Sequence, residues 1–193
     1  MAWTEYYEKM KGAPPRPLLT RVLEFVPEEF EKTALDLGCG IGTDTLFLLE
    51  KGWKVTVVEK EAEGVSLLKA GLDKSLSSRL RIIQSSFEAL SSLPRVHLVY
   101  ASYSLPFCQQ GSFPAFWKQI ESSFSDSCFF AANFFGPEDD WVRPRGCTGH
   151  SEAEIRELLK DFEILSLEEK KEFGPTATSG DKFWHLYTVI AKK

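Results

Sequence analysis

The sequence predicts an α/β fold: a doubly wound, mostly parallel sheet of seven strands with an antiparallel closing strand and helices on both faces. Short apolar runs alternate with helical segments along the chain. A glycine-rich turn follows the first apolar run and precedes a helix. The 193 residues, 43% of them hydrophobic, suffice for one sizeable core but not for two comfortable domains. We therefore expect a single domain over residues 1–193.

We expect residues 1–30 to form an N-terminal helical lid segment and residues 33–193 to form the core with the sheet. Glycine and proline at 12–15 separate two short helices, because neither residue supports a helix interior. The strands are apolar runs, of which the second is rich in β-branched residues, and Gly52 ends the helix between the first two. In order, the expected elements are helices Tyr6–Lys11 and Leu18–Phe25, strand Thr33–Leu37, helix Thr43–Lys51, strand Lys54–Val58, helix Ala62–Lys74 and strand Leu80–Gln84.

The C-terminal half continues the alternation and then closes the sheet. Strand Ser127–Phe135 is apolar from residue 128 onward except for Asn133, as is typical of a central buried strand. Ser151 and Glu154 form a capping-box pattern that begins a helix. The polar stretch 174–181 separates the last two strands, which we expect to pair antiparallel at the sheet edge. The remaining expected elements are strand Val96–Ser102, helix Phe113–Ser123, a helix from Ser151 to Leu159, and strands Phe162–Glu168 and Phe183–Ala191.

Composition and charge exclude several function classes. The net charge of −5 argues against binding along a nucleic-acid backbone, which needs a dense basic face, although charge alone leaves a tRNA substrate open. No apolar run has the length of a membrane span, and the N-terminus lacks the order of a signal peptide. The four cysteines and three histidines show no spacing suited to a metal. We expect a cytoplasmic protein without a metal, whose partner is a small molecule.

The most specific signal is the segment Leu35–Gly42, which reads LDLGCGIG between a strand and a helix. Glycines allow a positive φ and a close approach of a ligand to the backbone, so this turn forms the floor of a pocket. A dinucleotide fingerprint would place the third glycine at position 43, which is Thr43, and a P-loop lysine is absent. Glu59 ends the second strand, where a carboxylate can accept hydrogen bonds from both ribose hydroxyls of an adenosine.

This G-x-G-x-G spacing after an acidic residue resembles motif I of the class I S-adenosylmethionine-dependent methyltransferases. In size and layout the chain is similar to small bacterial members of the tellurite and thiopurine type. The resemblance implies a Rossmann-like fold, methyl transfer and S-adenosyl-L-methionine as the cofactor. It also implies that Asp36, Gly38, Gly40 and Gly42 surround the methionine part of the donor, and that Glu59 holds its ribose. The other donor-binding residues that it implies are Arg16, Cys39, Lys60, Ser86, Phe87 and Ser102.

Two positions depart from the family pattern. Ser86 follows the third strand where an acidic residue is frequent, so Ser86 and the backbone of Phe87 would serve the adenine. His97 begins the fourth strand where an aspartate is usual, and we interpret it as structural. These departures keep a second hypothesis open, a donor-binding protein without turnover that acts as a sensor or partner subunit. A nucleotide-reducing enzyme is a third.

The acceptor pocket is expected beside the donor, from the loops after the fourth and fifth strands and from the N-terminal lid. Methyl transfer mainly requires that nucleophile, methyl and sulfur be held in line in a dry pocket, and a base is needed only if a proton must leave. The candidates for positioning the acceptor are Tyr103, Trp141 and His150, for which aromatic packing under a loop is an equal alternative. Arg16 is a candidate partner of the donor's carboxylate, with a solvated arginine as the alternative.

Overall fold

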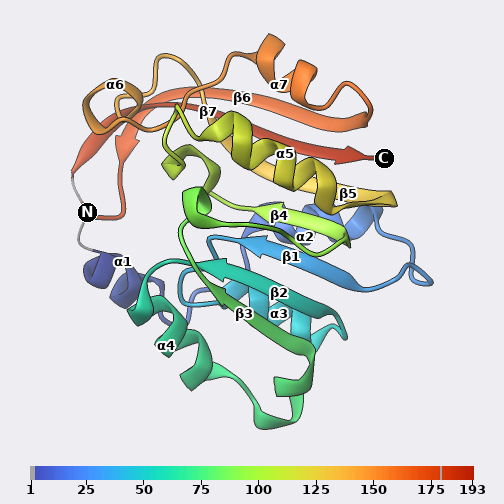
Figure 1. The fold of residues 1–193 in the computed structure, drawn as a ribbon. Coiled ribbons are helices and arrows are strands. Elements are labelled where there is room, and N and C mark those ends of the chain that lie inside the picture. The colour runs from blue at the N-terminus through green and yellow to red at the C-terminus, as the bar shows by residue number, and fades with distance from the viewer. Residues whose placement is uncertain (1–2, 179) are drawn as a thin grey trace.

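A central sheet organises the molecule in the computed structural model, which describes residues 3–178 and 180–193 (Figure 1). Within these residues the sheet has seven strands in the order β3-β2-β1-β4-β5-β7-β6. Strands β1 to β5 run parallel to their neighbours, and β7 is antiparallel to both β5 and β6. The predicted mostly parallel sheet with an antiparallel closing strand is therefore confirmed. The strands are β1 (Thr33–Leu37), β2 (Lys54–Glu59), β3 (Leu80–Gln84), β4 (Val96–Ala101), β5 (Phe124–Phe135), β6 (Glu163–Pro175) and β7 (Asp181–Lys192).

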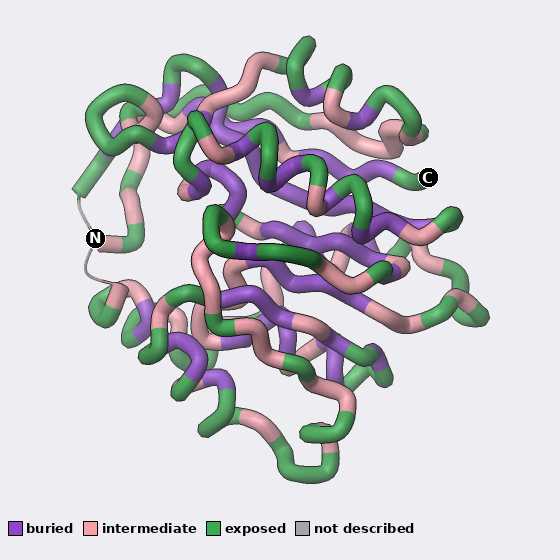
Figure 2. The backbone as a smooth tube through the Cα atoms, in the orientation of Figure 1, coloured by how far each residue is buried: buried purple, intermediate pink, exposed green. Residues whose placement is uncertain are grey.

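Helices cover both faces of the sheet. One face packs against α2, α3 and α4, and the other against α5 and α7. Successive residues of β1 alternate between the two cores, so this strand is buried on both sides, as the inner strands of a parallel sheet are (Figure 2). The helices are α1 (Trp3–Met10), α2 (Pro17–Phe25), α3 (Thr43–Glu50), α4 (Ala62–Gly71), α5 (Phe113–Ser123), α6 (Val142–Arg145) and α7 (Glu152–Leu158). Short 3-10 helices cover Lys74–Arg79, Phe87–Ala89 and Leu105–Phe107.

The final hairpin is longer than the sequence pattern predicts. Strands β6 and β7 pair without a gap from Glu163 with Lys192 to Pro175 with Asp181, apart from one register shift near Ile164. The sequence predicts that this strand ends at Glu168, because charged residues follow, but β6 continues to Pro175. An edge strand exposes one backbone edge and much of its side-chain surface to water, so it tolerates charged residues. Most of the predicted connection 174–181 thus belongs to the strands or their tight turn, and Ser179 lies outside the described residues.

Two other boundaries differ from the prediction. Helix α4 ends at Gly71 instead of 74, because Asp73 accepts a hydrogen bond from the Ser75 N–H and begins a 3-10 helix. Strand β5 begins at Phe124 instead of Ser127, because the polar residues 125–127 also adopt strand geometry. Its pairing with β4 is irregular along this extension. The capping box at Ser151 forms as predicted, with both of its hydrogen bonds to Glu154 present.

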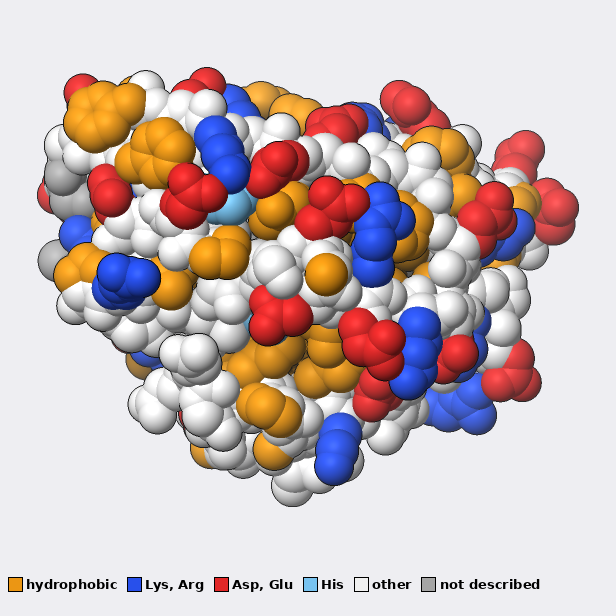
Figure 3. Space-filling view, turned by 90° about the horizontal axis from the view of Figure 1, so that it is seen from above, with side chains coloured by type: hydrophobic (Ala, Val, Ile, Leu, Met, Phe, Trp, Pro, Cys, Tyr) orange, Lys and Arg blue, Asp and Glu red, His pale blue; other side chains and the backbone are white. Residues whose placement is uncertain are grey.

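The exposed edge of the sheet is charged. Figure 3 looks down on the side of the molecule that carries β6 and α7, where acidic and basic side chains are interspersed without a continuous patch of one sign. Such an edge resists pairing with another strand. In the described part of the chain, no helix has the length and apolar character needed to cross a membrane.

Candidate functional site

A cavity of about 1110 Å³ opens where the parallel strands end. The arrowheads of β1 and β2 point toward the side on which α1 lies (Figure 1). The loops after β1, β2, β3 and β4 line one end of the cavity, and α1, β5, the segment around Trp141 and the β6–β7 hairpin line the rest. The volume exceeds the range of roughly 300–1,000 Å³ that is usual for one drug-sized ligand, so the cavity has room for two molecules.

The glycine turn forms the floor of one end. Gly38 and Gly40 line the cavity with φ angles of 78° and 55°, values that side chains other than glycine rarely adopt. A Cβ on Gly38 would lie 2.5 Å from the Cβ of Ser104, whereas one on Gly40 would lie 3.7 Å from the Tyr7 ring. Gly42 does not line the cavity, and a Cβ there would lie 2.2 Å from Cδ1 of Leu68. The structure thus places Gly42, which was expected to surround the donor, outside the cavity lining, because its Cα faces the packing of α3 on α4.

Glu59 is fixed beside this turn. It is the last residue of β2, and only 7% of its surface is exposed. Its Oε2 accepts the Gly40 N–H at 2.7 Å, and its Oε1 accepts the Glu61 N–H at 2.9 Å. A carboxylate retains further lone pairs when it accepts two backbone hydrogen bonds. Glu59 can thus bind hydroxyl donors in the cavity without moving.

Two buried aspartates stand behind the turn. Asp36 accepts a hydrogen bond from the Thr45 hydroxyl at 2.6 Å, and its burial raises its pKa to about 7, with the nearby charges of Asp44 and Glu59 acting in the same direction. Asp44, which the sequence reasoning missed, accepts hydrogen bonds from the Arg16 N–H at 2.8 Å and the Tyr100 hydroxyl at 2.7 Å. Its place in the first turn of α3 after a glycine loop was the available signal. Together with Glu59, these acids make one end of the cavity attractive to positive charge.

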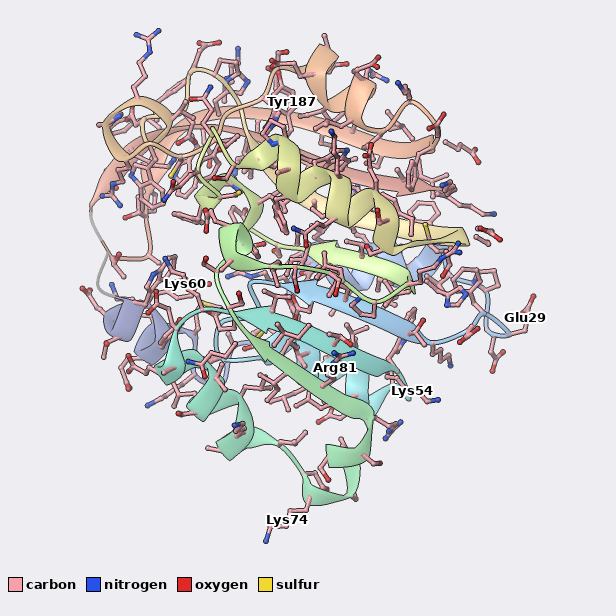
Figure 4. The ribbon with its side chains drawn as sticks, in the orientation of Figure 1. Glu29, Lys54, Lys60, Lys74, Arg81 and Tyr187 are labelled. Carbon is pink, nitrogen blue, oxygen red and sulfur yellow. The ribbon has the colours of Figure 1, made fainter. Side chains whose placement is uncertain are left out.

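The loop after β3 forms the adjoining wall. Ser86 and Phe87 line the cavity, and the Phe87 ring stacks on Phe116 at 4.5 Å between ring centroids. Lys60 follows β2 and lies on the side of α1, whereas Lys54 lies at the opposite end of the same strand (Figure 4). The structure brings to this cavity every predicted donor-binding residue except Gly42, namely Arg16, Asp36, Gly38, Cys39, Gly40, Glu59, Lys60, Ser86, Phe87 and Ser102.

The turn after β4 contains a strained tyrosine. Tyr103 has a φ of 52°, and it is the one residue other than glycine with a positive φ in the described ranges. Asn133, 2% exposed, holds this conformation, since its Oδ1 accepts the Tyr103 N–H at 3.2 Å and the Ser102 hydroxyl at 3.3 Å. Its Nδ2 donates to the Thr188 hydroxyl at 3.0 Å, which orients the amide. The sequence shows Asn133 as a polar residue within an apolar strand, but it does not show which groups Asn133 bonds.

The same turn presents a buried hydroxyl to the cavity. Ser104 is almost fully buried, lines the cavity beside Gly38, and its Oγ has no hydrogen-bond partner within the described residues. A buried hydroxyl without a partner is destabilising unless a ligand or water satisfies it. Ser104 is therefore a candidate ligand contact that the sequence reasoning did not single out.

The acceptor candidates separate into two groups. Tyr103 and Trp141 both line the cavity. His150 does not, because its ring packs against Phe113 and Phe134 with centroids 4.4 and 5.4 Å away, and its burial lowers its pKa. The structure thus places the candidate His150 outside the cavity lining, in the aromatic packing that was its alternative. His97 lies at the start of β4, away from the cavity, with its Nδ1 2.8 Å from the Thr33 hydroxyl, which agrees with the structural interpretation.

The N-terminal helix α1 lies over the cavity. Trp3, Tyr6 and Tyr7 line it, and burial near Glu59 raises the pKa of the Tyr7 hydroxyl. The Arg16 guanidinium donates to the Tyr6 hydroxyl and lies 5.1 Å from the centroid of the Tyr103 ring. Helix α2 instead packs into the core on the sheet face. Of the segment 1–30 that was expected to form a lid, α1 lies at the cavity and α2 does not, and Met1 and Ala2 lie outside the described residues.

Comparisons with known proteins agree with this geometry. Residues 34–125, from β1 to the start of β5, match the model of a family described as a methyltransferase domain. No curated protein matches the sequence significantly. The chain is similar in structure to TehB from Haemophilus influenzae, with a TM-score of 0.79 and 16% identity over 97% of this chain and 65% of TehB, so it spans just under two thirds of that protein.

Two further solved structures are similar over most of both chains. One is a SAM-dependent methyltransferase from Methanosarcina mazei, with a TM-score of 0.67 and 19% identity over 93% of this chain and 98% of the other. The other is the 1,6-didemethyltoxoflavin-N1-methyltransferase of Burkholderia thailandensis, solved with 1,6-didemethyltoxoflavin and S-adenosylhomocysteine bound. It has a TM-score of 0.68 and 18% identity over 99% of this chain and 85% of the other. At these identities the likeness establishes a shared fold.

Proposed function

Since the chain carries a methyltransferase domain of the class I S-adenosylmethionine-dependent type, we propose that it methylates a small molecule bound at the far end of the cavity from the glycine turn. The observation that supports this most directly is a single cavity that runs from Gly38, Gly40 and Glu59 to a wall of aromatic side chains. One end suits the donor, and the other leaves space for an acceptor beside it.

The residues of the first end fit S-adenosylmethionine. The donor supplies, when bound, a methyl group on a positively charged sulfur. Gly38 and Gly40 leave room at the cavity floor that a side chain would fill. Glu59 offers its carboxylate to ribose hydroxyls, and the acidic side chains Asp36 and Asp44 complement the positive charges of a sulfonium and an ammonium group. Ser104 offers a hydroxyl that has no hydrogen-bond partner among the residues that the structure describes.

The chain's own residues then contribute position and dryness. Helix α1 covers the cavity through Tyr7, which lies against Gly40, and through Trp3 and Tyr6. Excluding water strengthens each electrostatic contact inside the site. Holding the reactants in place can lower the activation free energy by several kcal/mol, on the order of 7–11 kcal/mol in the best intramolecular cases. Arg16 lines the cavity next to Asp44 and serves in this proposal as the partner of the donor's carboxylate.

A small acceptor suits this arrangement better than a macromolecule. The acceptor end is enclosed by α1 and the β6–β7 hairpin, which are connected where the Lys9 ammonium donates to the Ala177 carbonyl at 2.6 Å. The similar Burkholderia enzyme was solved with a small molecule bound, which supports the same class of acceptor here. We place the protein in the cytoplasm in this proposal because all four cysteines are free, as is typical of a reducing compartment.

The experiment that tests this function has two stages. Isothermal titration with S-adenosylmethionine and S-adenosylhomocysteine is expected to show binding of both, and a titration with NADH is expected to show none. Product formation is then measured across a panel of phenols, thiols, amines and metalloid oxyanions. Donor binding without turnover of any acceptor would favour a sensor or partner subunit, and absence of donor binding would refute the proposal.

A further inference from the structure

Six aromatic side chains form a continuous wall at the acceptor end of the cavity: Trp3, Tyr103, Phe107, Phe135, Trp141 and Trp184. Neighbouring rings meet mostly edge to face, with centroids 5.4 Å apart for Trp3 and Phe107, 5.6 Å for Trp141 and Trp184, and 6.3 Å for Tyr103 and Trp184. Such a surface offers both ring faces and ring edges to a ligand. Because offset and edge-to-face ring pairs gain energy beyond area burial, the wall favours a flat aromatic ligand over an aliphatic one of similar size.

A lysine behind this wall disfavours a cationic ligand. The Lys182 ammonium, 3% exposed, lies 3.9 Å from the Trp184 ring centroid, 4.3 Å from that of Trp141 and 4.4 Å from that of Phe135. It pairs with the buried Asp139 and does not line the cavity, so it contacts the rings from behind. An aromatic cage usually indicates a cationic ligand. Here one face of the rings already contacts the ammonium of the Lys182–Asp139 ion pair, so the rings offer less attraction to a cationic ligand on their other face.

A charged side chain that lines the cavity also disfavours a cationic ligand. The Arg145 guanidinium also lines the cavity and lies 4.3 Å from the Trp141 ring centroid. Three acidic residues line the cavity away from the glycine turn: Glu172 pairs with Lys170 at 2.6 Å, Glu5 pairs with Lys9 at 3.2 Å, and Glu88 accepts the Gln109 N–H at 2.9 Å. The cluster of buried carboxylates, Asp36, Asp44 and Glu59, is thus confined to the donor end.

Tyr103 is held ready for a ligand. Its left-handed backbone is unfavourable for a tyrosine, yet two hydrogen bonds from the turn to Asn133 maintain it. The result is a large aromatic side chain that remains 37% exposed at the cavity instead of joining the core. Strain that the surroundings maintain in this way is typical of binding sites.

We propose that the acceptor is a planar aromatic molecule that is neutral or anionic, bound with its ring against Tyr103 and Trp184. The proposal rests on the proposed function, because it names the substrate class of the same site. It restricts the acceptors of that function by shape, through the aromatic wall, and by charge, through Lys182 and Arg145, which contact the wall.

The test compares three probes on protein saturated with S-adenosylhomocysteine. Isothermal titration measures the affinity for 2-naphthoate, which is planar and anionic, for decahydronaphthalene-2-carboxylate, which has the same charge and ring skeleton without planarity, and for 2-naphthamidine, which is planar and cationic. We expect 2-naphthoate to bind at least about fivefold more tightly than either of the others. Equal or tighter binding of the saturated acid would overturn the inference about shape, and tighter binding of the amidine would overturn the inference about charge.

A pair of variants locates the effect. Tyr103→Leu is expected to weaken 2-naphthoate binding about fivefold and to leave S-adenosylhomocysteine affinity within about twofold. Phe173→Leu is the matched control, since Phe173 is 70% exposed and does not line the cavity. If Tyr103→Leu does not fold, Trp3→Leu on the covering helix takes its place. Unchanged 2-naphthoate affinity in the folded variant contradicts the inference. Wild-type protein that does not bind S-adenosylhomocysteine would instead refute the proposed function itself.

Discussion

The two ends of the cavity are built in different ways. The donor end is mostly backbone and near-consecutive sequence: a turn of glycines between β1 and α3, with Asp36 before it, Asp44 after it and Glu59 on the neighbouring strand. The acceptor end consists of side chains from α1, the turn after β4, β5, the segment around Trp141 and β7. A local pattern can therefore specify the donor end, while the acceptor end exists only after distant segments have packed together.

The largest effect is expected at Gly42, the third glycine of the turn, which packs in the core and does not line the donor end of the cavity. Gly42→Ala places a methyl group 2.2 Å from Leu68 at a φ of 83°. We expect the free energy of unfolding to fall by about 3 kcal/mol, from overpacking together with the left-handed conformation. Urea unfolding measures it. Gly146→Ala is the control, because its φ is also positive at 67° but its Cβ meets nothing, so about 1 kcal/mol is expected. Equal losses would show that the contact with Leu68 is unimportant.

The buried charge of the donor end is expected to make stability depend on pH. Asp36 has a pKa of about 7 in the folded protein against an ordinary value of 3.8, so the folded state binds the proton more tightly. The contribution of Asp36 to the free energy of unfolding is therefore fully favourable below pH 3.8 and is lost as the pH rises to about 7. Between these two values the loss is roughly 1.4 kcal/mol per pH unit. From pH 5 to pH 7 the loss is about 2–3 kcal/mol. Asp36→Asn should abolish this component of the decline in urea unfolding, and a variant with the wild-type slope would contradict the assignment.

Glu59 tests whether the donor end depends on side chains at all. Glu59→Gln keeps the shape but removes the charge that accepts hydroxyl hydrogen bonds, and such bonds contribute about 1.5–3 kcal/mol. We expect S-adenosylmethionine affinity in isothermal titration to fall by roughly tenfold to a hundredfold. The exposed Glu50→Gln is the matched control and is expected to bind normally. Unchanged affinity in a folded Glu59→Gln protein would mean that the backbone alone binds the donor.

Asn133 tests whether the acceptor end depends on one tertiary contact. Asn133→Ala removes the acceptor of the Tyr103 N–H and frees the strained turn. We expect kcat/KM for the acceptor that the product assay identifies to fall about tenfold, mainly through KM, with donor affinity within about twofold. Thr188→Val, which removes the hydrogen bond on the other side of the amide, should have a smaller effect.

A stability measurement checks the same assignment without an acceptor. Because glycine tolerates the φ of 52° at position 103, Asn133→Ala releases no strain in the Tyr103→Gly background, and there it should destabilise the protein more than in the wild type. If the two costs are equal, Asn133 supports the sheet and does not hold Tyr103, and it is then no positioning residue.

The sequence by itself determined the sheet, its helices and most of the donor end. Apolar and β-branched runs mark the strands. The turn at Leu35–Gly42 and Glu59 can be recognised from the sequence, because the carboxyl ends of neighbouring parallel strands always meet at one edge. Only the tertiary structure decided that Gly42 faces Leu68, that His150 packs away from the cavity, and that Asn133 holds Tyr103. The direction of a side chain within a close-packed core depends on neighbours far away in the chain, and these leave no mark at the residue's own position.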